Sequence, residues 1–322
     1  MRFIVYGVGA IGGTVAAALH RSGQDVVGIA RGAQLDAIRA DGLRIRTPDE
    51  EFTVGLPVVS HPSELTLGAD DAILIALKTQ HTQGALEALR DIGAEKQPVF
   101  CLQNGVANER MALRMFANVH GVTVVMPTTF LTPGEVIVNG TPRHGIFDLG
   151  RWPGGADTAD HAFAEALNAS NIAGHVTEDV ASSKYGKLLL NLGNIVGAAL
   201  GPEVDGSAIT EALIDEAKAV YRAAGIGWND VGMEDPRRKE FLKVREVAGT
   251  ERAGGSSYQS LARGAGSIET DYLNGEIALL GRLHGCPAPA NAAACLLGAR
   301  LVSEGKGPGS LSVDDLRAAL RL

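Results

Sequence analysis

Long apolar runs, clustered cysteines and an excess of positive charge are all missing from this sequence of 322 residues. No apolar stretch approaches the roughly 20 residues that a membrane-spanning helix needs, so we expect no membrane partner. The 29 basic and 37 acidic residues leave a net charge of −8. Because binding to phosphate backbones requires a basic face, this balance argues against nucleic acid as a partner.

Cysteine is also scarce, with Cys101, Cys286 and Cys295 widely separated along the chain. Three such residues make neither a disulfide framework nor a zinc site, and we expect no metal. Unpaired cysteines favour a reducing compartment, and therefore a cytoplasmic location.

The first half of the chain alternates short β-rich runs with helical patterns. Continuous apolar strands separated by helices are typical of a parallel sheet covered on both faces. The right-handed crossover rule then predicts an α/β fold with a Rossmann-type, doubly wound parallel sheet. The expected strands are residues 3–6, 25–30, 72–77 and 99–102, and the expected helices are residues 13–21 and 82–89.

Strand signals fade from residue 179 onward, and helical patterns dominate. We therefore predict two domains, a Rossmann-like domain over residues 1–176 and an all-helical domain over residues 177–322. The apolar helical half leaves a homodimer open. A segment rich in Gly, Ser and Arg, residues 249–266, is predicted to be a loop. The expected helices are residues 181–200, 209–224, 268–283 and 291–304.

A glycine pattern, G-x-G-x-x-G, stands directly after the first expected strand and before the first expected helix. Its first glycine permits a tight turn, its second lets the backbone approach a pyrophosphate, and its third lets helix and strand pack closely. The helix N-terminus adds N–H donors and positive potential for phosphates. The alternative is a glycine-rich turn without a ligand. The six residues are Gly7, Val8, Gly9, Ala10, Ile11 and Gly12.

Arg31 follows the second expected strand, where an NAD-dependent enzyme usually has an acidic residue. A guanidinium suits the 2′-phosphate of NADP, so the sequence favours NADP over NAD. Lys78 and Asn104 follow the next two strands, whose carboxyl ends line the ligand crevice in such sheets. The alternatives are an ordinary surface arginine and, for Lys78 and Asn104, a role in turn geometry.

Lys187, Asn191 and Asn194 lie at i, i+4 and i+7 of one helical pattern, so we expect them to share one helix face. The rest of this pattern is apolar, so its polar stripe must face something polar, for which a cleft between the domains is the candidate. The alternative is a lysine that reaches solvent at the helix flank, with asparagines that cap buried backbone. Glu269 begins another helical stretch, where an acidic residue is also ordinary compensation of the helix dipole.

Together these motifs resemble the ketopantoate reductase family, in order and over nearly the whole chain. The combination is far more specific than any one motif. It comprises the glycine pattern, Arg31-Gly32, Lys78, Gln103-Asn104-Gly105, Lys187-Leu-x-x-Asn191, Ser256-Ser257 and Glu269-x-Asp-Tyr-x-Asn-Gly275.

The resemblance implies reduction of 2-dehydropantoate to pantoate with NADPH, by a Rossmann domain and a helical domain. It implies that Lys187 donates the proton and that Glu269 belongs to the catalytic cleft. Asn104 matches an asparagine that touches cofactor and substrate. The implied substrate contacts are Asn104, Asn191 and one or both of Ser256 and Ser257. We also expect Asn194 to contact the substrate, since it lies one place before the position of a further asparagine in many members.

The sequence departs from the family pattern on the substrate side. Ile195 stands where many members have a second asparagine, and Asp205 falls near a further substrate-binding asparagine. One alternative is therefore an NADP-dependent reductase of another small 2-keto acid. A dehydrogenase of the opine or 6-phosphogluconate type, and a non-catalytic NADP-binding sensor, are further alternatives.

Overall fold

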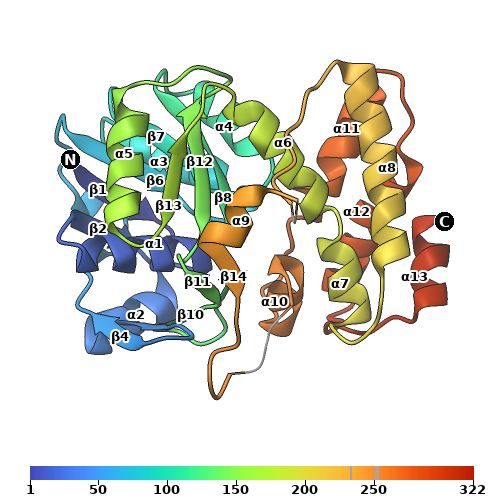
Figure 1. The fold of residues 1–322 in the computed structure, drawn as a ribbon, viewed down its shortest axis with the longest axis horizontal. Coiled ribbons are helices and arrows are strands. Elements are labelled where there is room, and N and C mark those ends of the chain that lie inside the picture. The colour runs from blue at the N-terminus through green and yellow to red at the C-terminus, as the bar shows by residue number, and fades with distance from the viewer. Residues whose placement is uncertain (233, 251–253) are drawn as a thin grey trace. The chain divides into compact units, whose positions relative to one another are not determined.

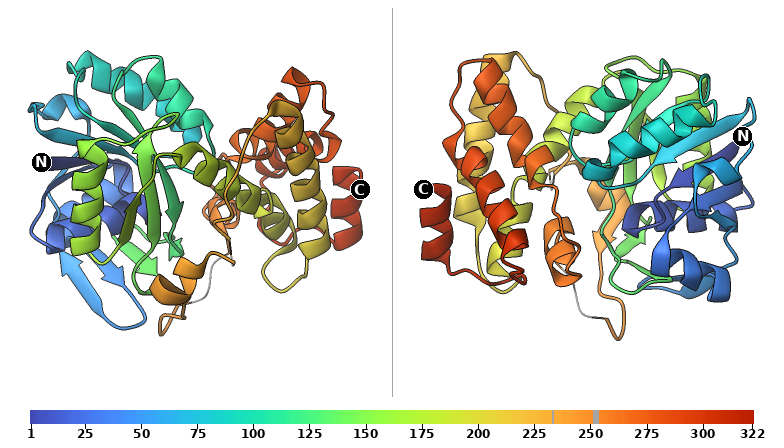
Figure 2. Two further views of the ribbon diagram at one scale, coloured as in Figure 1. Left: turned by 45° about the horizontal axis from the view of Figure 1, so that its top comes forward. Right: turned by 180° about the vertical axis from the view of Figure 1, so that it is seen from behind.

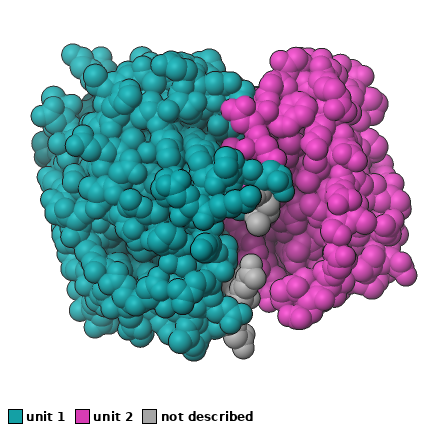
Figure 3. All heavy atoms as spheres, viewed as in Figure 1, with its two compact units in different colours: residues 1–103, 108–184, 233–250 teal, residues 104–107, 185–232, 251–322 magenta. Residues whose placement is uncertain are grey.

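The computed structural model describes residues 1–232, 234–250 and 254–322. Contacts between Cα atoms divide the chain into two compact units (Figure 3). Among the described residues, unit 1 comprises residues 1–103, 108–184 and 234–250, and unit 2 comprises the rest. The main crossing, between Lys184 and Tyr185, falls a few residues after the boundary predicted at residues 176–177. The short crossings at residues 104–107 and 234–250 have no counterpart in that prediction.

Unit 1 is built on an eight-stranded sheet with the order β13-β12-β8-β7-β6-β1-β2-β5 (Figure 1). All neighbouring strands in it are parallel except β8 and β12, which are antiparallel. The predicted α/β class with a Rossmann-type parallel sheet is confirmed. The strands are β1 (Arg2–Tyr6), β2 (Asp25–Ile29), β5 (Val58–Val59), β6 (Asp71–Ile75), β7 (Val99–Cys101), β8 (Val119–Val125), β12 (Ile146–Arg151) and β13 (Ala173–Val176).

Helices and two smaller sheets complete unit 1. The helices are α1 (Ala10–Arg21), α2 (Gly32–Asp41), α3 (Thr82–Asp91), α4 (Ala107–Leu113), α5 (Thr158–Ala169), α9 (Pro236–Phe241) and the 3₁₀ turns η1 (Pro62–Glu64) and η2 (Thr79–His81). One small sheet contains β4 (Glu51–Val54), β3 (Leu43–Arg46), β10 (Glu135–Val138) and β9 (Thr128–Thr129), and the other pairs β11 (Gly140–Pro142) with β14 (Leu242–Val244).

Aromatic side chains fill the core between the large sheet and α5. The ring centroid of Phe163 on α5 lies 5.5 Å from that of Phe3 and 4.8 Å from that of Phe100. All three side chains are almost fully buried. Burial of one such side chain contributes about 2–3 kcal/mol, so this cluster stabilises the packing of α5 on the sheet.

Strand β14 lies in the part of the sequence that was expected to be purely helical. It pairs with β11 in antiparallel register, with Gly140 opposite Val244. Arg237 on α9 joins the same segment to β12, because its guanidinium bridges Asp148 of β12 and Asp235 at distances of 2.5 Å and 2.7 Å. The segment 234–250 therefore belongs structurally to the sheet unit.

Among its described residues, unit 2 contains helices and no strand. Helix α11 packs on α12 and α8, and α12 packs on α13 (Figure 2). Among the described residues, no helix combines the length and apolarity needed to cross a membrane. The helices are the second part of α6 (Val180–Asn191), α7 (Asn194–Leu200), α8 (Ser207–Ala224), α10 (Ser256–Ala262), η3 (Thr270–Tyr272), α11 (Asn274–Leu283), α12 (Pro289–Ser303) and α13 (Val313–Leu320).

Two details of unit 2 differ from the sequence prediction. The single helix expected over residues 181–200 is two helices, α6 and α7, with a break at Leu192–Gly193. A Cβ on Gly193 would lie 2.8 Å from Thr210 of α8, so the close approach of α8 requires glycine at the break. The loop expected over residues 249–266 contains helix α10, and residues 251–253 of that segment lie outside the described residues.

Candidate functional site

The glycine pattern forms the turn between β1 and α1 in unit 1. Gly7 has φ = +105°, a conformation that favours glycine, and a Cβ there would lie 3.0 Å from the carbonyl of Ala76. A Cβ on Gly12 would clash with the carbonyl oxygen of Gly7 and would lie 2.8 Å from the Cβ of Ala76. Both glycines are therefore required for the packing of α1 against the ends of β1 and β6.

Gly9 differs from these two glycines because its environment is open. A Cβ there would have only one neighbour within 4 Å, a ring carbon of Phe130 at 4.0 Å. Gly9 is also the N-cap residue of α1, which has no side-chain cap and no acidic residue in its first turn. The remaining loop residues, Val8, Ala10 and Ile11, continue this turn into the helix. The loop thus fits a pyrophosphate group, with uncapped N–H donors beside backbone that a ligand can approach.

Other side chains of unit 1 hold the loop and its surroundings in place. Gln34 on α2 donates from Nε2 to the carbonyl of Val8 at 2.8 Å and accepts from the N–H of Gly134 at 2.7 Å. The exposed Arg31 donates from Nη2 to the hydroxyl of Tyr6 at 3.1 Å. Tyr6 directly precedes the loop, so the Arg31 guanidinium is anchored next to it.

Lys78, the other predicted cofactor residue of unit 1, follows β6 and precedes the 3₁₀ turn η2. It is partly exposed, as expected for a residue at the carboxyl edge of a parallel sheet.

The predicted catalytic and substrate-binding residues all belong to unit 2. Asn104 reaches it through the short crossing at residues 104–107. The next residue, Gly105, has φ = +78°, and a Cβ there would lie 3.0 Å from the carbonyl oxygen of Tyr272 in η3. The Asn104–Gly105 turn therefore packs on the turn that follows Glu269.

Lys187 and Asn191 lie one turn apart on α6, so they share a helix face as predicted. Lys187 is partly buried and Asn191 is 5% exposed. Among the residues that the structure describes, the Asn191 side-chain oxygen is one of the buried polar atoms without a hydrogen-bond partner. Since such an atom costs free energy unless it is bonded, this amide suits a ligand that donates to it.

The helix is interrupted at Leu192–Gly193, so Asn194 opens α7 instead of continuing α6. Asn194 nevertheless lies near the serine pair, since a Cβ on Gly255 would be 3.2 Å from the Asn194 side-chain oxygen. Ser256 and Ser257 open α10, which packs on α7, and of the two Ser257 is buried.

Glu269 is 7% exposed and caps the 3₁₀ turn η3 instead of lying within a long helix. Asn274 stabilises the chain where α6 ends, at Leu192. Its Nδ2 donates to the carbonyl of Leu192 at 3.2 Å and to the side-chain oxygen of Asn291 at 3.0 Å. Asn291 in turn donates to Glu216 of α8 at 2.8 Å. The asparagine of the motif at residues 269–275 therefore has a structural role, which sequence reasoning missed.

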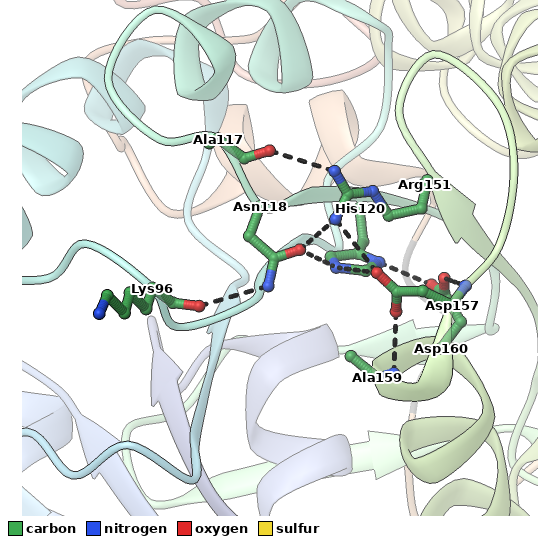
Figure 4. Close-up of polar contacts among 8 residues, drawn as sticks. All are labelled: Lys96, Ala117, Asn118, His120, Arg151, Asp157, Ala159 and Asp160. Atoms are coloured by element: carbon green, nitrogen blue, oxygen red, sulfur yellow. Dashed lines mark hydrogen bonds and ion pairs between the residues drawn. The ribbon is translucent and has the colours of Figure 1, made fainter.

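A cluster in unit 1 contains side chains of the types that bind metals, with ligand atoms of His120, Asp157 and Asp160 within 4.8 Å of one another. In this structure His120 lies 2.8 Å from Asp160 and 3.0 Å from the Asn118 side-chain oxygen (Figure 4). Arg151 pairs with Asp157 at 3.1 Å. Asp157 and Asp160 form the capping box of α5, so the cluster fastens α5 to β8 and β12.

Comparisons with known proteins place the chain in one family. Residues 3–154 match the family model described as ketopantoate reductase PanE/ApbA, and residues 179–298 match the model of its C-terminal part. The 2-dehydropantoate 2-reductase of Pyrococcus horikoshii is 28% identical over 302 residues, which cover 90% of this chain and 94% of that protein. The enzyme of the same name from Mesorhizobium japonicum is 29% identical and covers 94% of this chain and 98% of its own.

Solved structures agree with the family models. A PanE/ApbA family ketopantoate reductase from Ralstonia eutropha has a TM-score of 0.77 with 29% identity, covering 95% of this chain and all of its own. A D-mandelate dehydrogenase, solved with NADH and anilino(oxo)acetate, also has a TM-score of 0.77, but its 21% identity indicates a shared fold alone. The family models, the curated relatives and the fold agree that this chain belongs to the ketopantoate reductase family of oxidoreductases.

Proposed function

We propose that this protein reduces 2-dehydropantoate to pantoate with NADPH. The observation that carries the proposal is the face of α6 on which Lys187 lies one turn before the buried Asn191 amide, whose oxygen has no partner among the described residues. An ammonium and an unsatisfied amide side by side suit a substrate that bears a carbonyl and a hydroxyl, as 2-dehydropantoate does.

On the cofactor side, the loop at Gly7–Gly12 and the uncapped N-terminus of α1 would hold the pyrophosphate. Arg31, fixed by Tyr6, would bind the 2′-phosphate that distinguishes NADP from NAD. When bound, the reduced nicotinamide supplies a hydride to the carbonyl carbon of the substrate.

The remaining chemistry would fall to side chains of unit 2. As the hydride arrives, negative charge develops on the carbonyl oxygen, and the Lys187 ammonium stabilises this charge and transfers a proton to it. The products are a 2-hydroxy acid and the oxidised cofactor. Asn104 and Asn191 would orient the substrate, Ser256 or Ser257 would bind its carboxylate, and Glu269 would orient Lys187 or a substrate hydroxyl.

A second candidate is the reduction of a different small 2-keto acid. Asp205, near the position of a substrate asparagine in the family pattern, is exposed and accepts from the N–H of Ser207 at 2.9 Å, and Ile195 is buried. The fold does not choose between substrates, because a D-mandelate dehydrogenase has it too.

A spectrophotometric assay of NADPH oxidation tests both candidates. The panel contains 2-dehydropantoate, pyruvate, 2-ketoisovalerate and phenylglyoxylate. We expect the highest kcat/KM for 2-dehydropantoate. A clear preference for another acid would select the second candidate, and no turnover of any 2-keto acid would contradict both.

The Arg31→Ala variant tests the cofactor assignment. We expect the Kd for NADPH to rise about tenfold or more and the Kd for NADH to stay unchanged, because only NADPH carries the 2′-phosphate. Arg39→Ala, an exposed arginine on α2, is the control. Equal use of NADH and NADPH by the unaltered protein would refute the role of Arg31.

The state of the cysteines supports a reducing compartment such as the cytoplasm. Cys101, Cys286 and Cys295 are all free. Burial raises the pKa of the Cys101 thiol well above its usual value and that of Cys295 to about 12. Because the thiolate is the reactive form, neither thiol is suited to redox or nucleophilic chemistry.

A further inference from the structure

A buried ion pair in unit 1 lies outside every role described so far. Lys184 on α6 pairs with Glu109 on α4, and their side chains are 2% and 0% exposed. The Lys184 ammonium also donates to the carbonyl of Gln103 at 2.8 Å and to that of Val122 at 3.4 Å. Its three N–H groups thus meet three acceptors, two of which are main-chain carbonyls.

The surroundings are shaped to admit this lysine. A Cβ on Gly121 of β8 would lie 3.3 Å from the Cδ of Lys184 and 3.1 Å from Val180, so glycine leaves room for the lysine stem. Burial raises the pKa of Glu109, while the nearby Lys184 opposes that rise. A charged pair in such a place adds little stability compared with apolar side chains of similar size, so its position requires another explanation.

The residue that Lys184 holds, Gln103, is fixed from its side chain as well. Its Nε2 donates to the hydroxyl of Thr82 at 2.6 Å, and that hydroxyl donates to Asn108 at 2.8 Å. Asn108 donates to the hydroxyl of Thr79, the residue after Lys78, at 3.2 Å. Both the main chain and the side chain of Gln103 are therefore bound within unit 1.

Gln103 and Lys184 both lie where the chain passes from unit 1 to unit 2. Gln103 is the last residue of unit 1 before Asn104, and Lys184 is the last residue of unit 1 on the helix that carries Lys187. The Lys184–Gln103 hydrogen bond therefore joins two of the points at which the chain leaves unit 1.

We propose that Lys184 and Glu109 are positioning residues, which fix Asn104 through the Gln103 carbonyl and fix Lys187 through the start of α6. This inference rests on the proposed function, because it assumes that Asn104 and Lys187 act on the substrate. Glu109 holds the Lys184 ammonium in place, and the ammonium holds the Gln103 carbonyl. Neither residue touches the reacting atoms.

The double variant Lys184→Met/Glu109→Leu separates positioning from stability. It replaces the pair by apolar side chains, so we expect Tm to stay within about 3 °C of the unaltered protein. We expect kcat to fall about 10- to 100-fold while the Kd for NADPH changes less than threefold, because Asn104 and Lys187 are no longer held in reacting geometry. Near-normal kcat at near-normal Tm would overturn the proposal and leave a purely structural pair.

Two further variants keep the test decisive. Glu109→Gln retains the shape of the side chain and an acceptor for Lys184, so it should fold even if the double variant does not. We expect a severalfold lower kcat, and an unchanged kcat would refute the role of Glu109. Asp160→Asn, which disturbs the buried pair with His120, should lower Tm without the loss of kcat.

Hydrogen–deuterium exchange gives a readout that does not depend on activity. In the double variant we expect faster exchange of the amides at residues 103–107. Unchanged exchange there would overturn the proposal that Lys184 holds this segment. If the unaltered protein reduces no 2-keto acid, the proposed function fails, whereas this exchange still decides whether Lys184 holds the segment.

Discussion

The two candidate regions of the molecule are built in different ways. The proposed cofactor loop of unit 1 is one continuous hexapeptide between a strand and a helix, braced by Gln34. The proposed catalytic set of unit 2 comes from four separate segments, with Asn104, Lys187, Ser257 and Glu269 on different elements. The loop therefore depends on backbone shape, and the catalytic set depends on side-chain chemistry held by tertiary packing.

This difference separates the expected consequences of substitution. A change in the glycine loop acts on packing or on ligand approach, depending on which glycine is replaced. A change in the catalytic set should remove chemistry and leave the fold and the cofactor site intact. A catalytic-set variant that also lost stability or NADPH binding would show that the two regions are not independent.

Lys187→Ala has the largest expected effect. Without the proton donor, we expect kcat to fall by about 10²- to 10⁴-fold, because general acid catalysis contributes on that scale. The Kd for NADPH, measured by fluorescence titration, should stay within a factor of about three, since the proposed cofactor loop and Arg31 lie in unit 1. Lys218→Ala on α8 is the control, with normal kcat expected. Turnover near the normal rate in Lys187→Ala would show that another group supplies the proton.

Two glycine variants compare packing with ligand approach inside the loop. Gly12→Ala should lower the free energy of unfolding by about 1–3 kcal/mol, because its methyl group clashes with the Gly7 carbonyl. Gly9→Ala should change stability by less than about 0.5 kcal/mol, since its methyl group enters open space. Its Kd for NADPH should nevertheless rise about tenfold, because that space is where the pyrophosphate would lie.

Chemical denaturation and NADPH titration measure both variants. If the Gly9→Ala variant bound NADPH with normal affinity, the pyrophosphate would not lie beside Gly9. A Gly12→Ala protein of full stability would mean that α1 can move away from β1 at little cost.

The same contrast explains what could be predicted from the sequence. The glycine turn and the parallel sheet follow from local patterns. The spacing of Gly7 and Gly12 predicts the turn, and the continuous apolar runs predict the buried strands. The break between α6 and α7 does not follow from such patterns. It includes Gly193, whose Cβ would lie 2.8 Å from Thr210 of α8, and a local pattern does not reveal this tertiary contact. The uninterrupted apolar pattern therefore predicted one helix, whereas the chain forms two.

Two other features could not be predicted from the sequence, because each depends on contacts between residues far apart in the chain. Strand β14 is three residues long with Lys243 at its centre, and only its pairing with β11 makes it a strand. Lys184 and Glu109 read in sequence as ordinary helical charges. The one available signal was the position of Lys184, three residues before Lys187 on a helix with few exposed side chains.

The smallest expected effect is a difference in acid sensitivity between the units. Burial lowers the pKa of His144 in unit 1, helped by Arg21 and Arg143 and opposed by Glu50. The folded state therefore binds a proton less readily than the unfolded chain. As pH falls through about 6.5, the unfolded state takes up more protons and unit 1 loses stability. His144→Gln should weaken this pH dependence without changing stability much at pH 8.

The two tryptophans allow each unit to be followed separately, because Trp152 lies in unit 1 and Trp228 in unit 2. In Trp228→Phe, urea unfolding followed by Trp152 fluorescence should show a midpoint that falls between pH 7.5 and pH 5.5. In Trp152→Phe, the Trp228 midpoint should fall less. Equal shifts would mean that the units unfold as one cooperative body, so that protonation of His144 destabilises unit 2 as much as unit 1.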